Sequence, residues 1–220
     1  MATRKITLYL DIVSPFAYIA FHVLRKSAAF SRCDITYVPI FLGGLMNMCS
    51  NTPPIQVKNK ASWINKERIR WAKRCSVPIA EKTPDGFPTP TLSVQRALCA
   101  VSKRHPAHFA QTIEELYQSY WVEGNARIGQ PEGFLPVLEK VLGTEVAHEV
   151  LKASNQQDTK NLLSANTGQA FKAGAFGLPW FECTNSHGET ECFWGIDRLS
   201  HVADFLGLEQ SWDKGFKAMM

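Results

Sequence analysis

The sequence lacks the features that most directly reveal a function. None of its six cysteines forms a C-x-x-C pair, which excludes a zinc ribbon and a dithiol redox motif. The six histidines show no metal-ligand spacing. No stretch reaches the roughly 18 apolar residues of a membrane-spanning helix, and a net charge of +4 is too small to indicate nucleic acid. We therefore expect no metal, no nucleic acid and no membrane span.

Recognisable targeting signals are also missing. The segment Met1–Leu10 has no long apolar stretch after its basic residues, so it does not resemble a signal peptide. The last three residues, Ala218-Met219-Met220, are not a peroxisomal address. Six cysteines in 220 residues are few for a secreted disulfide scaffold. We expect a cytoplasmic location and leave a mitochondrial or peroxisomal one open.

The sequence has the composition of an ordinary globular protein, with 45% hydrophobic and 20% charged residues. At roughly 150 residues per domain, 220 residues correspond to between one and two domains. A chain of this size buries a sizeable core without disulfides or metals.

The two ends of the chain and its middle differ in pattern. Short β-rich runs occur only near the ends, whereas residues 60–172 show helical periodicity throughout. The order is β-α-β, a helical block and then β-β-α, which predicts an α/β fold with a helical insertion. The expected strands are Ile6–Leu10, Ile35–Ile40, Trp180–Thr184 and Thr190–Trp194.

Four sites in the sequence are candidates for chemistry. Ser14 precedes Pro15 at a strand-to-helix turn, where free N–H groups and a partial positive charge favour an anion. A cis Leu178–Pro179 bond would leave the main chain of Leu178 free for an extended ligand. Asp197 begins the last helix and could bind an amine, and Asn51 lies in a loop after a Gly43–Gly44 turn.

Each of these sites also has a purely structural explanation. Ser14 and Asp197 suit helix caps, and Asn51 suits an Asx-turn. Most X-Pro bonds are trans, so Pro179 on frequency alone simply opens an edge strand. Only the combination of the four favours a ligand site.

The order of elements, with a proline before the third strand, is the thioredoxin arrangement. Ser14 and Ala17 stand where redox members carry C-x-x-C. The chain resembles the kappa-class glutathione transferases, in a superfamily shared with 2-hydroxychromene-2-carboxylate isomerases and bacterial disulfide oxidoreductases. The motifs that carry the resemblance are Asp11–Phe16, Phe41–Met46, Asn51–Pro54, Gly174–Pro179 and Gly195–Arg198.

The resemblance implies a role for each matching residue. Ser14 matches the catalytic serine that stabilises the glutathione thiolate, and Pro15 and Phe16 complete its turn. Asn51 matches a glutathione-contacting asparagine. Leu178, before the cis-proline Pro179, matches the residue that pairs by main chain with the cysteinyl part of glutathione. Ile196 and Asp197 match the pair that holds the γ-glutamyl end. The family usually has a small hydroxyl residue at the position of Ile196, where this chain offers only a main-chain N–H.

The resemblance also implies an organisation and an activity. We expect a thioredoxin-like glutathione-binding domain from residues 1–44 and 174–220, with an inserted helical domain from 45–173. The expected function is conjugation of glutathione, the co-substrate, to hydrophobic electrophiles, with glutathione peroxidase activity as a second expectation, in a homodimer. The alternatives are a glutathione-dependent isomerase and a non-catalytic glutathione- or peptide-binding module. A thiol–disulfide oxidoreductase is disfavoured because both redox cysteines are replaced.

Three further patterns carry weaker predictions. If the last hairpin turns on His187–Gly188, Cys183 lies opposite Cys192, and a disulfide or redox switch between the two is one reading. Lys58 or Lys60 could reach the glycyl carboxylate of glutathione. The basic run around Arg68 and Arg70 is interpreted as a solvated helix face.

Overall fold

The computed structural model describes residues 3–208. The predicted thioredoxin-like domain includes residues 1–2 and 209–220 at its two ends. These residues, with the final tripeptide, lie outside the described residues. The strands are β1 (Lys5–Leu10), β2 (Asp34–Pro39), β3 (Trp180–Thr184) and β4 (Thr190–Trp194). The α-helices are α1 (Pro15–Lys26), α2 (Leu42–Met48), α3 (Lys60–Arg74), α4 (Leu92–Arg104), α5 (Pro106–Tyr117), α6 (Pro131–Leu142), α7 (Thr144–Ser154), α8 (Gln157–Lys172) and α9 (Leu199–Phe205). Shorter helical turns are η1 (Ala28–Phe30), η2 (Pro54–Gln56), η3 (Gln118–Val122) and η4 (Ile196–Arg198).

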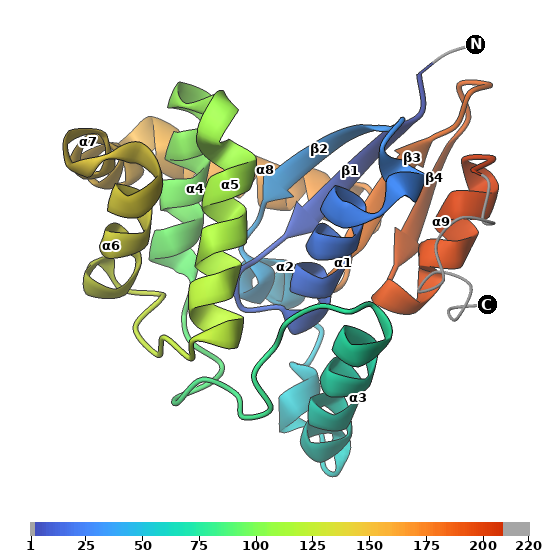
Figure 1. The fold of residues 1–220 in the computed structure, drawn as a ribbon, viewed down its shortest axis with the longest axis horizontal. Coiled ribbons are helices and arrows are strands. Elements are labelled where there is room, and N and C mark those ends of the chain that lie inside the picture. The colour runs from blue at the N-terminus through green and yellow to red at the C-terminus, as the bar shows by residue number, and fades with distance from the viewer. Residues whose placement is uncertain (1–2, 209–220) are drawn as a thin grey trace.

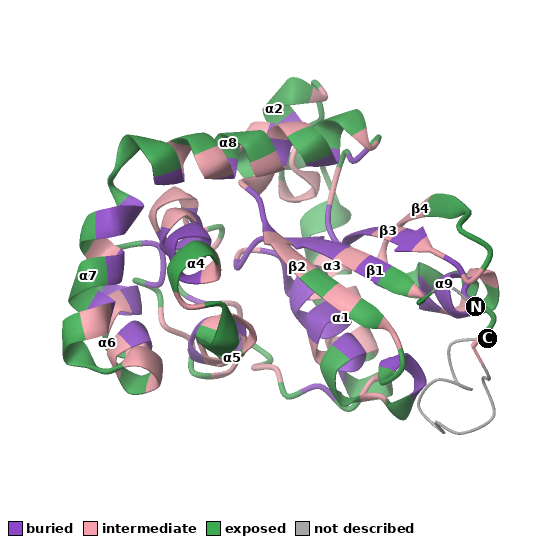
Figure 2. Ribbon diagram, turned by 90° about the horizontal axis from the view of Figure 1, so that it is seen from above, coloured by how far each residue is buried: buried purple, intermediate pink, exposed green. Residues whose placement is uncertain are grey.

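The four strands form one mixed sheet in the order β2-β1-β3-β4. Strand β1 runs parallel to β2 and antiparallel to β3, and β4 closes the sheet antiparallel to β3. Helix α1 covers one face and α8 the other (Figures 1 and 2). Both faces of the central strand β1 are covered toward its carboxyl end, where Leu8 and Tyr9, which point to opposite faces, are fully buried. The predicted α/β thioredoxin-like fold is confirmed.

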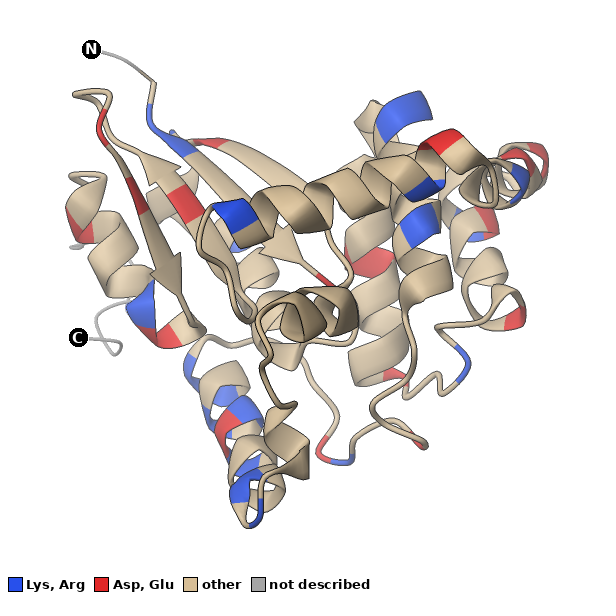
Figure 3. Cartoon of the chain, turned by 180° about the vertical axis from the view of Figure 1, so that it is seen from behind, with Lys and Arg blue, Asp and Glu red and all other residues tan. Residues whose placement is uncertain are grey.

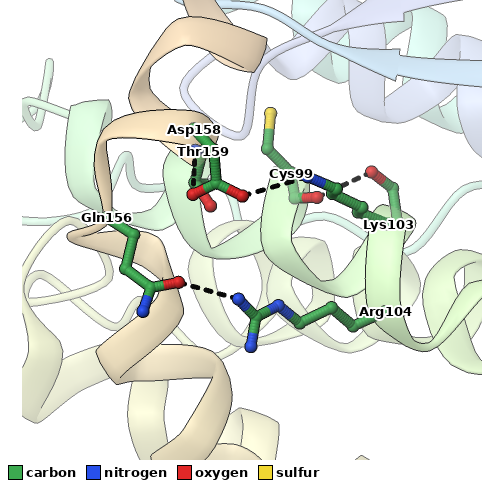
Figure 4. A network of polar contacts seen from close by, with 7 residues as sticks. Cys99, Lys103, Arg104, Gln156, Asp158 and Thr159 are labelled. Carbon is green, nitrogen blue, oxygen red and sulfur yellow. Dashed lines mark hydrogen bonds and ion pairs between the residues drawn. The ribbon is translucent and has the colours of Figure 1, made fainter.

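The described chain between β2 and β3 is helical and contains no strand. Helices α4 to α7 stack beside the end of the sheet (Figure 1). The start of α8 is joined to α4 by exposed polar contacts: Lys103 pairs with Asp158 at 3.0 Å, and Arg104 donates to Gln156 at 2.8 Å (Figure 4). The exact division into two domains stays a prediction. No helix among residues 3–208 is long and apolar enough to cross a bilayer.

Three successive carbonyls join the carboxyl end of β1 to the helical region. The amide of Gln95 on α4 donates to Leu10 at 3.0 Å, and it also donates to Ile40 after β2 at 2.7 Å. The hydroxyl of Tyr117 on α5 donates to the Asp11 carbonyl at 3.3 Å. The indole of Trp121 in η3 donates to the Ile12 carbonyl at 2.9 Å. The helices therefore supply the partners that this buried corner needs.

The turn from β1 into α1 follows the sequence prediction. Ser14 is the N-cap of α1, and Pro15 is its first residue. The side chain of Ser14 accepts a hydrogen bond from the amide of Ala17 at 3.2 Å. A capping hydroxyl and a proline with a pre-set φ are local signals, which is why the sequence located this turn.

The predicted pairing of Cys183 with Cys192 is wrong. Cys183 lies opposite Glu191, and Cys192 lies opposite Glu182. The loop has five residues, 185–189, because Asn185 closes it with main-chain and side-chain hydrogen bonds to Glu189 and His187. That loop shifts the register by one residue, which places the two cysteines on opposite faces of the sheet. None of the six cysteines is in a disulfide bond.

Two other local predictions, a helix cap at Asp197 and a turn at Gly43–Gly44, are wrong. Asp197 does not cap the last helix: it lies inside the turn η4, and its carboxylate pairs with Arg198 at 2.6 Å. Gly43 and Gly44 do not form a turn but lie within α2. The ring of Phe41 packs against both glycines, and a Cβ at either position would meet it at 3.0–3.1 Å. This close approach explains glycines in a helix that their propensity disfavours.

We expect Gln95→Leu to lower the free energy of unfolding by about 1–3 kcal/mol, because the buried Ile40 carbonyl then has no donor. Urea denaturation measures the change. Gln111→Leu, at an exposed position of α5, is the matched control and should change stability by less than about 0.5 kcal/mol. Equal effects of the two substitutions would contradict the role of Gln95.

We expect thiol titration of the denatured protein to count six thiols both before and after reduction. Neighbouring strand residues on opposite faces cannot bond without a register shift. A gain of two thiols on reduction would show that the register between β3 and β4 is not the one described.

Candidate functional site

A cavity of about 570 Å³ lies at the carboxyl end of β1, beside the first turn of α1. It brings together five of the residues singled out in the sequence: Ser14, Pro15, Phe16, Asn51 and Leu178. The other walls come from α2 and the loop after it, the start of α3, the loop before α4, residues 176–177 before β3 and the end of β4. These lining residues include Phe41, Leu42, Met46, Trp63, Ile64, Phe87, Pro88 and Thr91.

Ser14 is the polar centre of the cavity. It is 5% exposed, and its oxygen accepts from Ala17, so the hydroxyl hydrogen has no acceptor among the described residues. Pro15 has no N–H, and the amide of Tyr18 already donates to the Ser14 carbonyl at 3.1 Å. The amide of Phe16 is therefore the one unpaired N–H in this turn among the residues described. A hydroxyl hydrogen and a helix N-terminal amide thus remain available to an anion in the cavity.

The Leu178–Pro179 peptide bond is cis. Neither the amide nor the carbonyl of Leu178 has a hydrogen-bond partner within residues 3–208. Leu178 lines the cavity, so its main chain can pair with an extended ligand. A second cis bond, Phe87–Pro88, lies in the opposite wall, and no pattern in the sequence singled it out.

Asn51 lies at the edge of the cavity and joins two of its walls. Its side-chain amide donates to the Phe176 carbonyl at 2.8 Å, and its main-chain amide donates to Met46 at 2.8 Å. It does not form the Asx-turn that was its structural alternative. The contacts position residues 176–178 against the loop after α2.

Ile196 and Asp197 are not among the cavity's lining residues. Ile196 is 3% exposed, and the carboxylate of Asp197 is engaged by Arg198. The Gly195 amide donates to the Pro179 carbonyl at 3.0 Å, which keeps this pair next to the cis-proline. The role in ligand binding that the resemblance implies for Ile196 and Asp197 therefore stays a prediction.

Sequence reasoning missed the aromatic rim of the cavity, which consists of Trp63, Phe176 and Trp194. The exposed fractions of these side chains are 55%, 40% and 49%. The rings of Phe176 and Trp194 lie 4.8 Å apart. Trp194 packs directly on Gly177, where a Cβ would meet its indole nitrogen at 2.9 Å. Solvent-exposed aromatics at the mouth of an apolar cavity favour a ligand with a flat, apolar part.

Lys60, the first residue of α3, is the one charged residue among those that line the cavity in the described chain. Lys58 does not line it. Lys and Arg residues gather on α3 (Figure 3), but the helix is not a uniformly solvated basic face. Arg68 is fully buried and donates to the carbonyls of Ala80 and Glu81.

Asp11 lies beneath the cavity, fully buried. Its carboxylate accepts from the amide of Leu42 at 2.8 Å and from that of Val13 at 3.2 Å. Burial raises the pKa of Asp11 to about 6, although its hydrogen bonds act in the opposite direction. No sequence pattern assigned it a role, since its importance depends on Leu42, which is distant in the chain.

The protein's own cysteines are poorly suited to react in this cavity. None of the six lines it. Burial raises the pKa of the Cys99 thiol to about 12 and that of Cys183 well above its usual range. Within residues 3–208, no three His, Cys, Asp or Glu side chains form a metal-binding group.

Comparisons with known proteins identify the family of the chain. The DSBA-like thioredoxin domain family matches residues 5–207. Glutathione S-transferase kappa 1 of Rattus norvegicus is 30% identical over 94% of this chain and 92% of its own length. A 2-hydroxychromene-2-carboxylate isomerase of Pseudomonas putida is 27% identical over 90% and 92%. A solved 2-hydroxychromene-2-carboxylate isomerase superposes with a TM-score of 0.75 at 22% identity, covering 92% of this chain and 94% of its own.

The match to the family model covers most of the chain, and the match to the rat protein is nearly full length for both chains. The chain belongs to the DSBA-like thioredoxin domain family and, within it, to the kappa-class glutathione S-transferases.

Proposed function

We propose that the protein is a glutathione transferase in which Ser14 stabilises the glutathione thiolate for attack on a hydrophobic electrophile. The observation that carries this proposal is the hydroxyl hydrogen of Ser14, which has no acceptor among the described residues. It lies beside the unpaired amide of Phe16 in an apolar cavity. The curated kappa-class relatives support it.

Both groups act on the pKa of the ligand thiol. A free thiol has a pKa near 8.5, so only a small fraction is thiolate at neutral pH. Each unit by which the pKa falls requires about 1.4 kcal/mol of preferential stabilisation of the thiolate. A hydroxyl donor and a helix N-terminus together supply roughly one to two such units. The thiolate then attacks the electrophile directly and displaces its leaving group, without a protein nucleophile.

The rest of glutathione finds complementary groups around the cavity. The free amide and carbonyl of Leu178 suit the cysteinyl main chain. Lys60 offers a positive charge for the glycyl carboxylate. Asn51 keeps its side-chain oxygen free, since only its amide is used by Phe176. We assign the γ-glutamyl end to Ile196 and Asp197, next to Pro179.

The electrophile is assigned to the apolar part of the cavity, between Phe16 and the aromatic rim. Lys60 is the one charged residue among the described residues that line the cavity. The cavity therefore favours uncharged, apolar acceptors. Peroxidase activity on an apolar hydroperoxide would use the same thiolate. We further propose that the protein forms a homodimer.

A glutathione-dependent isomerase is the second candidate, and the match to the Pseudomonas putida isomerase supports it. It would use the same thiolate and the same glutathione site and would differ only in the acceptor. A panel of aryl halides and hydroxychromene carboxylates separates the two activities. Glutathione binding without turnover of any acceptor would favour a non-catalytic binding module, and reduction of insulin above background would favour an oxidoreductase.

We expect Ser14→Ala to lower turnover of an aryl halide by more than about tenfold, because the thiolate loses its hydroxyl donor. In calorimetry near pH 7, glutathione binding to the wild-type protein should release protons as the thiol ionises. The variant should release fewer. Unchanged turnover would contradict the role of Ser14.

The matched control for this variant is Ser27→Ala. Ser27 also caps a helical turn, with its oxygen accepting from Ala29 at 3.4 Å, but it is not one of the cavity's lining residues. Both variants lose a cap, which costs about 1 kcal/mol. Only Ser14→Ala should lose activity, which separates catalysis from stability.

We expect Lys60→Met to raise the KM for glutathione about three- to fivefold with little change in kcat. An exposed charge pair contributes up to about 1 kcal/mol to binding. Lys58→Met removes an equally exposed charge that does not line the cavity and should leave the KM unchanged. Steady-state kinetics at low ionic strength measures the KM of both variants. Equal increases in KM would show that the effect comes from the protein's net charge and not from a contact with Lys60.

A further inference from the structure

The buried carboxylate of Asp11 contacts three of the segments that line the cavity around Ser14. One oxygen accepts from the amide of Leu42, at the start of α2, and the other accepts from the amide of Val13 in the β1–α1 turn. The hydroxyl of Thr91, just before α4, also hydrogen-bonds to the carboxylate. Val13, Leu42 and Thr91 all line the cavity.

The main chain of Asp11 adds a further link. Its carbonyl accepts from the Ser14 amide at 3.0 Å and from the Tyr117 hydroxyl at 3.3 Å. One residue thereby fixes the capping serine, the turn that carries it and the two walls that face it. These segments are far apart in sequence, and no other side chain in the described chain donates to or accepts from all of them.

No positive charge compensates this carboxylate. The influences on its ionisation are burial and hydrogen bonds from Leu42, Thr91, Val13 and the Ile12 main chain, and no Lys, Arg or His is among them. The titratable groups that face it from the packed elements are Tyr117 on α5 and Tyr120 in η3, and both are neutral in the physiological range because burial raises their pKa values. Ionisation of Asp11 is therefore governed by burial and by these hydrogen bonds alone.

We propose that Asp11 is a positioning residue whose ionised carboxylate holds the three walls of the cavity against Ser14, so that its protonation loosens the site. When the carboxyl takes up a proton, one acceptor position becomes a donor. Val13 and Leu42 donate to different oxygens of the carboxylate, so a proton on either oxygen weakens the hydrogen bond which that oxygen accepts. The site then opens locally while the fold remains.

The direction of the pH dependence follows from the pKa of Asp11, which burial raises from 3.8 to about 6. The folded state binds this proton more tightly than the unfolded state does. The contribution of Asp11 to global stability is therefore greatest below pH 3.8 and is lost as the pH rises through about 6. The proposed loosening of the cavity walls has the opposite pH dependence to this stability contribution. It appears as the pH falls through about 6, when Asp11 becomes protonated. A local measurement thus separates positioning from a merely structural role.

The test is amide hydrogen exchange at Val13 and Leu42 in the ligand-free protein between pH 5 and 7.5, corrected for the intrinsic exchange rate. Protection of both amides in the wild-type protein should fall about tenfold toward pH 5, as expected for loss of a hydrogen bond to a charged group. In Asp11→Asn, protection should be low and independent of pH. A flat wild-type profile, or wild-type protection in Asp11→Asn, would overturn the proposal.

Two further variants make the experiment robust. Asp34→Asn removes an exposed carboxylate of β2 and should keep the wild-type profile. Thr91→Val keeps the shape of the side chain but removes one donor, which should raise the pKa of Asp11 and shift the midpoint of protection to higher pH. If Asp11→Asn fails to fold, the shift in the protection midpoint of Thr91→Val decides the test. An unchanged midpoint in Thr91→Val would overturn the proposal.

Glutathione affinity, measured by calorimetry over the same pH range, extends the test to the ligand, and this arm rests on the proposed function. Affinity should fall with wall protection in the wild-type protein and should lose that pH dependence in Asp11→Asn. Affinity that does not follow protection would refute control of the ligand site by Asp11. If the wild-type protein binds no glutathione at any pH, the proposed function fails, whereas the exchange experiment still decides the role of Asp11.

Discussion

The carboxyl end of β1 is the place on which the rest of the structure depends. The strand is buried on both faces, so the carbonyls of residues 10–12 must find their donors inside the molecule. Gln95, Tyr117 and Trp121 supply them from three different helical elements. The helical region therefore completes the corner from which Ser14 projects: it adds a second donor to the carbonyls of Leu10 and Asp11, and it supplies the donor that the Ile12 carbonyl would otherwise lack.

This corner explains why a serine is sufficient at the head of α1. Pro15 removes one N–H, and the Ser14 oxygen takes that of Ala17, which leaves only the hydroxyl hydrogen of Ser14 and the amide of Phe16 to meet an anion. None of the six cysteines lines the cavity. The geometry suits a sulfur that is brought by a ligand, and the protein supplies its electrostatic environment.

How well the sequence predicted each feature depended on how local its cause is. The cap and proline of α1 are adjacent residues, so Ser14 and Pro15 were placed correctly. Both strands of the last hairpin were located to the residue, yet their register was wrong by one, because the side chain of Asn185 closes a longer loop. Gly43 and Gly44 form a helix only because Phe41 packs on them. The position of Asp11 beneath three walls needs the whole fold, and no local pattern contains it.

The corner around Ser14 and the aromatic rim of the cavity differ in the same way. The corner around Ser14 is built by neighbouring residues and by buried main chain, so a substitution there disturbs hydrogen bonds that the core requires. The aromatic rim of Trp63, Phe176 and Trp194 is exposed and comes from α3, the segment before β3 and the end of β4. Substitutions on this rim change few buried contacts and therefore cost little stability. If the proposed function holds, the preference for an acceptor can change while the corner around Ser14 stays the same, so one fold can support more than one reaction of glutathione.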